Sequence, residues 1–161
     1  MLMKTILTIS FICFLLVGFT GPSKGQNLTK LQRSKIEKQV DSIFITSVKA
    51  AENVDYDKIS LGVDDRNNAG FIVNSSYFTK YDSLINNLKT NLRSATKQSI
   101  SIHKKKITVL SDKIVLLTAS GDAQVESGTG QSFHVKFLWS FVYEKINNDW
   151  KVIQSHQSRA N

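Results

Sequence analysis

Cysteine and proline are almost absent from this sequence, and their scarcity limits how the chain can be built. Cys13 is the only cysteine and Pro22 the only proline among 161 residues. Cys13 follows Phe11 and Ile12 inside an apolar run, whereas a lipidated cysteine needs a small residue just before it, so the sequence does not predict a lipoprotein. Beyond this run the chain can form neither a disulfide nor a thiolate metal site. We therefore expect a hydrophobic core to hold the fold unaided.

Acidic residues are also scarce, with 13 Asp and Glu against 21 Lys and Arg and a formal charge of +8. Such an excess can indicate a nucleic-acid or anionic-surface partner. Here the basic residues are scattered, and the one run, at 104–106, is typical of a solvated strand end or hairpin. We expect no nucleic-acid partner.

The first 25 residues differ in composition from the rest. Lys4 precedes an apolar stretch over residues 6–19, and helix breakers and small residues follow at 21–25. This pattern predicts a signal peptide over residues 1–25, cleaved before Gln26, and hence an exported protein, periplasmic or secreted, with no membrane contact after cleavage. The alternative is a transmembrane anchor, but the apolar stretch is shorter than the roughly 20 residues that span a bilayer.

The remaining residues, 26–161, are enough for one domain. In residues 28–51 apolar side chains recur every three or four positions, which predicts an amphipathic helix capped by Asn27 or Thr29. Shorter elements are expected after it: a helix over 53–61 capped by Asp55, a strand over 71–73, and a helix from about Thr79.

The last third of the chain is nearly all strand, with turn signals between apolar runs. The expected strands cover residues 99–110, 113–125, 131–146 and 150–158. In the third of them Phe137, Trp139 and Phe141 fall on one face, as in a sheet with one apolar side. Helices followed by such a meander predict an α+β fold, in which N-terminal helices pack on a curved, mainly antiparallel sheet.

The order of these elements resembles the nuclear transport factor 2-like (SnoaL-like) family over residues 28–158. Residues 143–153 are similar to the family's aromatic strand end, turn and following Trp strand. The last strand also resembles the association domain of calcium/calmodulin-dependent protein kinase II, where a Trp is followed at six and eight residues by His and Ser, here His156 and Ser158 after Trp150. The resemblance implies a cone-shaped fold and an exported member of unassigned activity.

His156 is the first candidate for chemistry. By period two, Gln154 and His156 share a face with Trp150 and Val152, and on the concave side they would look into the cone. A histidine there can act as an acid or base near neutral pH. The alternative is a structural histidine bonded to backbone or to Ser158.

Asp64 and Asp65 precede residues 70–77, which resemble the small hairpin of the family, and are the second candidate. A carboxylate at an apolar cone mouth has its pKa raised by desolvation, which would make Asp65 a usable base. Residues 64–68 are equally typical of an ordinary turn.

Aromatic residues are spread so that they can line an apolar pocket for a small apolar or aromatic ligand. The alternatives are core packing or a dimer face. The predicted ligand-binding residues are Tyr56, Tyr81, Phe137, Trp139, Phe141, Gln154 and His156.

Metal and cofactor motifs are missing from the sequence. His103, His134 and His156 fall on three different expected strands, and no phosphate-binding loop joins a strand to a helix. We expect no metal and no cofactor. Two hypotheses follow: an exported binding or self-associating module, expected as a homodimer, or a SnoaL-like isomerase, cyclase or dehydratase using His156 or Asp65.

Overall fold

A computed structural model describes residues 27–91 and 95–160. The predicted signal peptide, residues 1–25, lies outside the described residues. The helices and strands are α1 (Lys30–Glu52), α2 (Tyr56–Ser60), β1 (Phe71–Val73), β2 (Ser76–Phe78), α3 (Tyr81–Asn91), β3 (Ala95–Val109), β4 (Ile114–Ser127), β5 (Ser132–Ile146) and β6 (Asp149–Ala160).

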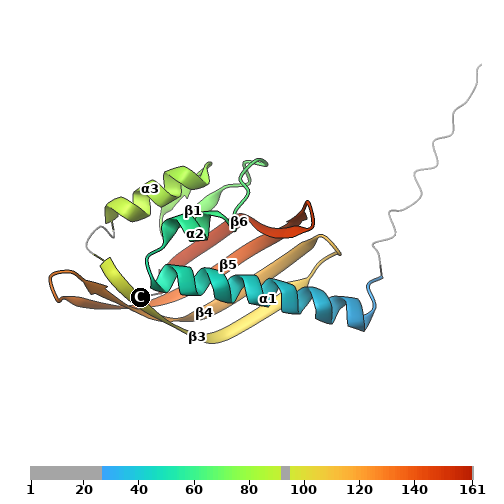
Figure 1. The fold of residues 1–161 in the computed structure, drawn as a ribbon, viewed down its shortest axis with the longest axis horizontal. Helices are drawn as coiled ribbons and strands as arrows, with labels where there is room; N and C mark the ends of the chain where they lie inside the picture. Colours follow the sequence, from blue (N-terminus) through green and yellow to red (C-terminus); the bar gives the residue numbers. More distant parts are fainter. Residues whose placement is uncertain (1–26, 92–94, 161) are drawn as a thin grey trace, which may run out of the picture.

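The six strands form one curved sheet that does not close, in the order β2-β1-β6-β5-β4-β3. All neighbouring strands are antiparallel except β1 and β6, which pair in parallel over three residues. The long helix α1 lies along one face of the sheet, and α2 and α3 follow on the same side (Figure 1). The predicted α+β architecture is confirmed.

Helix α1 begins with a capping box. The Gln32 N–H donates to Thr29 Oγ1 at 3.2 Å, and the Thr29 N–H donates to Gln32 Oε1 at 2.8 Å. Thr29, rather than Asn27, is therefore the cap, and such a cap stabilises a helix by about 1 kcal/mol. The apolar stripe of the helix is buried as its spacing predicts, at Ile36, Val40, Phe44 and Val48.

The core lies between that stripe and the concave face of the sheet. Phe44 of α1 meets Phe141 of β5 with ring centroids 6.0 Å apart. Trp150 of β6 is buried, and its indole Nε1–H donates to Gln39 Oε1 of α1 at 3.2 Å. The predicted apolar face of β5 thus packs toward the long helix.

Several strand boundaries differ from the prediction by a few residues, and two of the differences are explained by strand pairing. β3 begins at Ala95, four residues before the predicted start at 99, because its polar first residues pair with the end of β4 at Ser127. β2 forms in a segment without apolar alternation, held by pairing with β1. These residues are strand because they form backbone hydrogen bonds with a neighbouring strand. Their local sequence pattern does not predict it.

Membrane-spanning helices were sought among the described residues. None of the helices there has the length and apolar character to cross a bilayer.

Candidate ligand pocket

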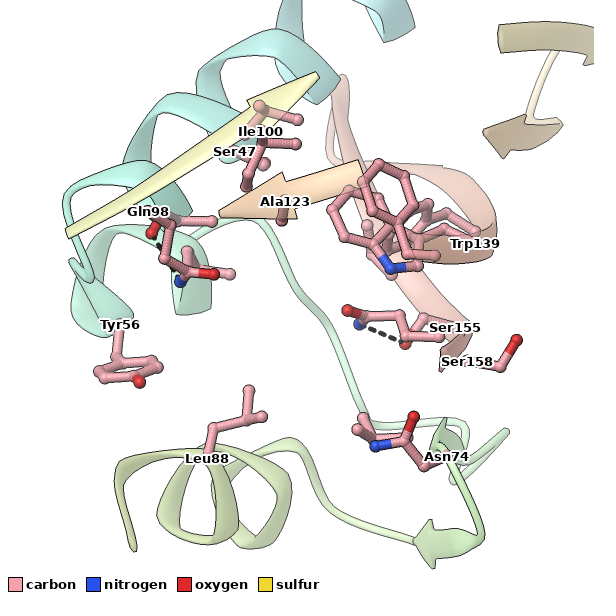
Figure 2. Close-up of a pocket in the computed structure, with 18 of the residues that line it drawn as sticks. Ser47, Tyr56, Asn74, Leu88, Gln98, Ile100, Ala123, Trp139, Ser155 and Ser158 are labelled. Atoms are coloured by element: carbon pink, nitrogen blue, oxygen red, sulfur yellow. Dashed lines mark hydrogen bonds between the residues drawn. The ribbon is translucent and has the colours of Figure 1, made fainter. Parts of the chain in front are cut away.

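A cavity of about 370 Å³ lies between the helices and the concave face of the sheet. Each layer of the fold contributes to its wall. Figure 2 shows Ser47 of α1, Ile100 of β3, Ala123 of β4, Leu88 of α3 and Tyr56 of α2 around it. The volume suits one small organic molecule.

One wall of the cavity is aromatic. Phe137 and Trp139 of β5 are stacked, with ring centroids 3.8 Å apart and planes 15° from parallel. Phe141 continues the row, with its ring edge-on to Trp139. Because these residues alternate along one strand, their rings all point to the concave face. The wall presents an apolar, aromatic surface to the cavity.

The side of the cavity that β6 forms is polar. Ser155 is almost fully buried, and its Oγ accepts a hydrogen bond from Gln157 Nε2 at 3.4 Å. Arg159 continues the same face, and its backbone N–H donates to Oδ1 of Asn74 in the β1–β2 turn at 3.1 Å. Arg159 is the only charged side chain among the described residues that line the cavity.

The opposite end of the cavity carries tyrosine and amide groups. The Tyr56 hydroxyl is buried and has no hydrogen-bond partner within the described residues. Gln98 is held in place, because its Nε2 donates to the Ala51 carbonyl of α1 at 3.0 Å. Burial raises the pKa of Tyr56, Tyr81 and Tyr143 above the ordinary value for tyrosine. These phenols stay protonated near neutral pH, so they can donate hydrogen bonds but cannot act as bases.

Several solved structures share the fold of this chain. A nuclear transport factor 2-like superfamily protein from Salmonella enterica is 15% identical, with 80% of this chain and 94% of that chain covered and a TM-score of 0.71. Hexachlorocyclohexane dehydrochlorinase LinA-type3 from Novosphingobium barchaimii is 12% identical over 83% and 92% of the two chains, with a TM-score of 0.67. No family model and no curated protein matches the sequence.

A third structure bears on the predicted resemblance of the last strand. A Xanthomonas campestris protein, assigned to the calcium/calmodulin-dependent protein kinase II association domain, is 19% identical over 75% of this chain and 85% of that chain, with a TM-score of 0.65. The chain has the nuclear transport factor 2-like fold. At these identities the similarity establishes the fold and does not transfer an activity.

Within the nuclear transport factor 2-like fold, five of the seven predicted ligand-binding residues line the cavity. They come from three separate elements that the fold brings together: Tyr56, Tyr81, Phe137, Trp139 and Phe141. Gln154 and His156 do not line it. His156 is exposed and lies opposite Ser140 on the outer face of the sheet.

The prediction that Gln154 and His156 share a face with Val152 is wrong, and the reason is a β-bulge in β6. Tyr143 pairs with Val152 while the preceding Val142 pairs with Gln154, which leaves Ile153 as an extra residue. One extra residue reverses the alternation of side chains along a strand. From that point the concave face belongs to Ser155 and Gln157.

The two aspartates make structural contacts, Asp64 within its own turn and Asp65 at the start of α3. Arg66 pairs with Asp64 at 2.8 Å, and its hydrogen bonds lower the pKa of the Asp64 carboxyl, opposite to the predicted rise. Asp65 Oδ2 accepts from the Tyr81 N–H at 3.0 Å, and Lys80 lies 3.6 Å from its other oxygen. Neither carboxylate lines the cavity. The turn interpretation describes them better than the acid/base one.

The three histidines lie on β3, β5 and β6, as predicted. Two of them nevertheless meet at Asp122 of β4, with His103 Nε2 at 2.6 Å from Oδ1 and His134 Nε2 at 3.0 Å from Oδ2. This carboxylate links three neighbouring strands. Over residues 27–91 and 95–160, no group of three His, Cys, Asp or Glu side chains is arranged to hold a metal ion.

The polar side of the cavity was missed by sequence reasoning. Ser155, Gln157 and Arg159 belong to a run, residues 154–159, in which every side chain is polar. Alternation identifies a buried face only where apolar and polar residues take turns. Residues 154–159 contain no apolar residue to alternate with the polar ones. Only the pairing of β6 with β5 shows which of these side chains face the cavity.

Proposed function

We propose that this chain is a small-molecule-binding module whose ligand is a compact, largely apolar molecule with an aromatic ring. The stacked pair Phe137 and Trp139, which lines the cavity, is the observation that carries the proposal. Aromatic walls of this kind favour a flat ligand, because offset stacking adds to the burial of apolar area. The cavity's few hydrogen-bonding groups would set the ligand's orientation.

Binding is favoured over catalysis by the chemistry of the lining. The described lining residues include no Asp, Glu, His or Lys. A SnoaL-like isomerase, cyclase or dehydratase needs an acid or base within hydrogen-bond reach of its substrate. The two candidates for that role, Asp65 and His156, lie outside the lining, so the enzyme hypothesis loses the residues on which it was based.

The test uses N-phenyl-1-naphthylamine, a neutral aromatic probe whose fluorescence rises in apolar surroundings. We expect saturable binding of one molecule per chain. Ala123→Phe should abolish binding, because Ala123 lines the cavity and a phenyl ring there fills it. Gln124→Phe is the matched control, since the next side chain along β4 points to the outer face. Equal binding by both variants would place the probe elsewhere and refute the proposal.

Self-association is a separate part of the proposed role. Leu138 is 54% exposed on the outer face of the sheet, and Leu116 and Val142 form a half-buried pair on that face. Exposed apolar side chains on a sheet face favour association with a partner that buries them. The Xanthomonas campestris structure of the same fold is assigned to an association domain. We propose that a second copy of this chain covers the outer face. The predicted export of the protein likewise stays a proposal.

A further inference from the structure

We infer that the polar side of the cavity recognises a carboxylate carried by the aromatic ligand, with Arg159 as its counter-charge. This inference rests on the proposed function, since it specifies the ligand of the same cavity. Three observations support it: the unbalanced charge of the lining, the hydrogen-bond donors left free there, and their position beside the aromatic wall.

The charge of the cavity lining is positive and unbalanced. Arg159 is an exposed residue of the lining and contributes the only charge among the described lining residues, and no ion pair of the described part of the chain involves its guanidinium. A planar guanidinium matches a carboxylate geometrically, and the two can form paired hydrogen bonds. One cation also suits a monoanion better than a doubly charged phosphate.

Neighbouring groups have donors to spare. Oδ1 of Asn74 already accepts the Arg159 N–H, which fixes the amide so that its NH₂ group remains free to donate. The Ser155 hydroxyl accepts from Gln157, so its own proton remains available. Figure 2 shows Asn74 and Ser155 on the same side of the pocket. Hydrogen-bond donors on the same side of a cavity as one arginine, with no carboxylate in the lining, favour an anion.

The pairing of β5 with β6 places the polar side of the cavity next to the aromatic wall. Gln157 lies directly opposite Trp139, Arg159 opposite Phe137, and Ser155 opposite Phe141. Residues paired across strands have Cβ atoms about 5 Å apart. A ring stacked on the aromatic wall would therefore hold a carboxylate on a short side chain against β6. An arylacetate has this shape.

The experiment compares two ligands that differ only in charge. 1-Naphthylacetate and its neutral amide, 1-naphthylacetamide, each displace bound N-phenyl-1-naphthylamine from the protein. We expect the carboxylate to bind about tenfold more tightly than the amide, as one charge-assisted contact provides. Arg159→Gln should remove this preference, and Arg159→Lys should keep part of it.

Lys136→Gln is the matched control. Lys136 lies one residue before Phe137 on β5, so its side chain is on the opposite face of the sheet, yet its replacement removes the same charge. The preference for the carboxylate should persist in this variant. Equal competition by the two ligands, or a preference that survives Arg159→Gln, would overturn the inference and leave the proposed function standing. Failure of the neutral probe to bind at all would instead refute the proposed function.

Discussion

Tyr56 carries a buried polar group with no partner among the described residues. This group is the phenolic hydroxyl, and burial raises its pKa. A buried polar group that lacks a hydrogen bond costs about 1–3 kcal/mol of stability. A ligand that accepts a hydrogen bond from this phenol would recover that cost on binding.

Tyr56→Phe should therefore stabilise the ligand-free protein by about 1 kcal/mol, because the change removes the unsatisfied hydroxyl and keeps the ring. Denaturant unfolding followed by circular dichroism measures the difference. Tyr77→Phe is the control: Tyr77 is 60% exposed, and its hydroxyl is not among the buried groups of the described residues that lack a partner, so its loss should change little. A Tyr56→Phe variant that is less stable than the parent would show that the hydroxyl already has a partner.

Strands, as elements, supply most of the cavity wall, and their irregularities decide its shape. The extra residue Ile153 in β6 turns Ser155, Gln157 and Arg159 inward. A second irregularity lies between Ile102 and Lys104 of β3, opposite Gly121 of β4. A Cβ atom at Gly121 would lie 1.9 Å from the Ser101 carbonyl oxygen and 2.8 Å from the Phe137 ring. Because Gly121 has no side chain, β3 can lie close to β4 at this point and the Phe137 ring can pack beside Gly121.

Gly121→Ala should lower the free energy of unfolding by about 2 kcal/mol, the usual cost of overpacking a tight site. The cost is expected because the nearest obstacle is backbone, which moves only if β3 moves with it. Thermal and denaturant unfolding measure it. Ser120→Ala, one residue earlier with its side chain on the outer face, should be nearly neutral. Similar losses in the two variants would show that the close crossing is not what limits position 121.

At the scale of the whole molecule, the helices cover one face of the sheet and leave the other face uncovered. The helices and the cavity occupy the concave side of the curved sheet (Figure 1). The outer side carries the His103–Asp122–His134 contacts together with the exposed Leu138. The proposed ligand site and the proposed association face therefore lie on opposite sides of the sheet and do not compete for the same residues.

Self-association through the outer face predicts that Leu138→Lys converts a dimer to a monomer, because a buried unpaired charge at an interface is costly. Size-exclusion chromatography with light scattering measures the mass. Leu31→Lys is the control, since Leu31 is 81% exposed but lies on α1, on the other side of the sheet. A monomeric parent protein, or equal disruption by both changes, would rule out the proposed dimer.

The sequence by itself determined the elements whose signals are periodic and local. The stripe of α1 and the apolar face of β5 around Trp139 follow from spacing and side-chain type, whereas the cap of α1 was narrowed only to Asn27 or Thr29. Such signals depend on a residue and its near neighbours, so they can be read without knowing what packs against them. The order of these elements was enough to predict the fold.

Tertiary structure alone decided which side of β6 faces inward and that the cone leaves a cavity. The face of β6 depends on a one-residue bulge against β5, which an all-polar run such as residues 154–159 cannot signal. The cavity depends on how far the sheet curves away from α1 and α3. Both are set by contacts between segments distant in the chain, and for that reason Arg159 gained its place in the site only once the strands were paired.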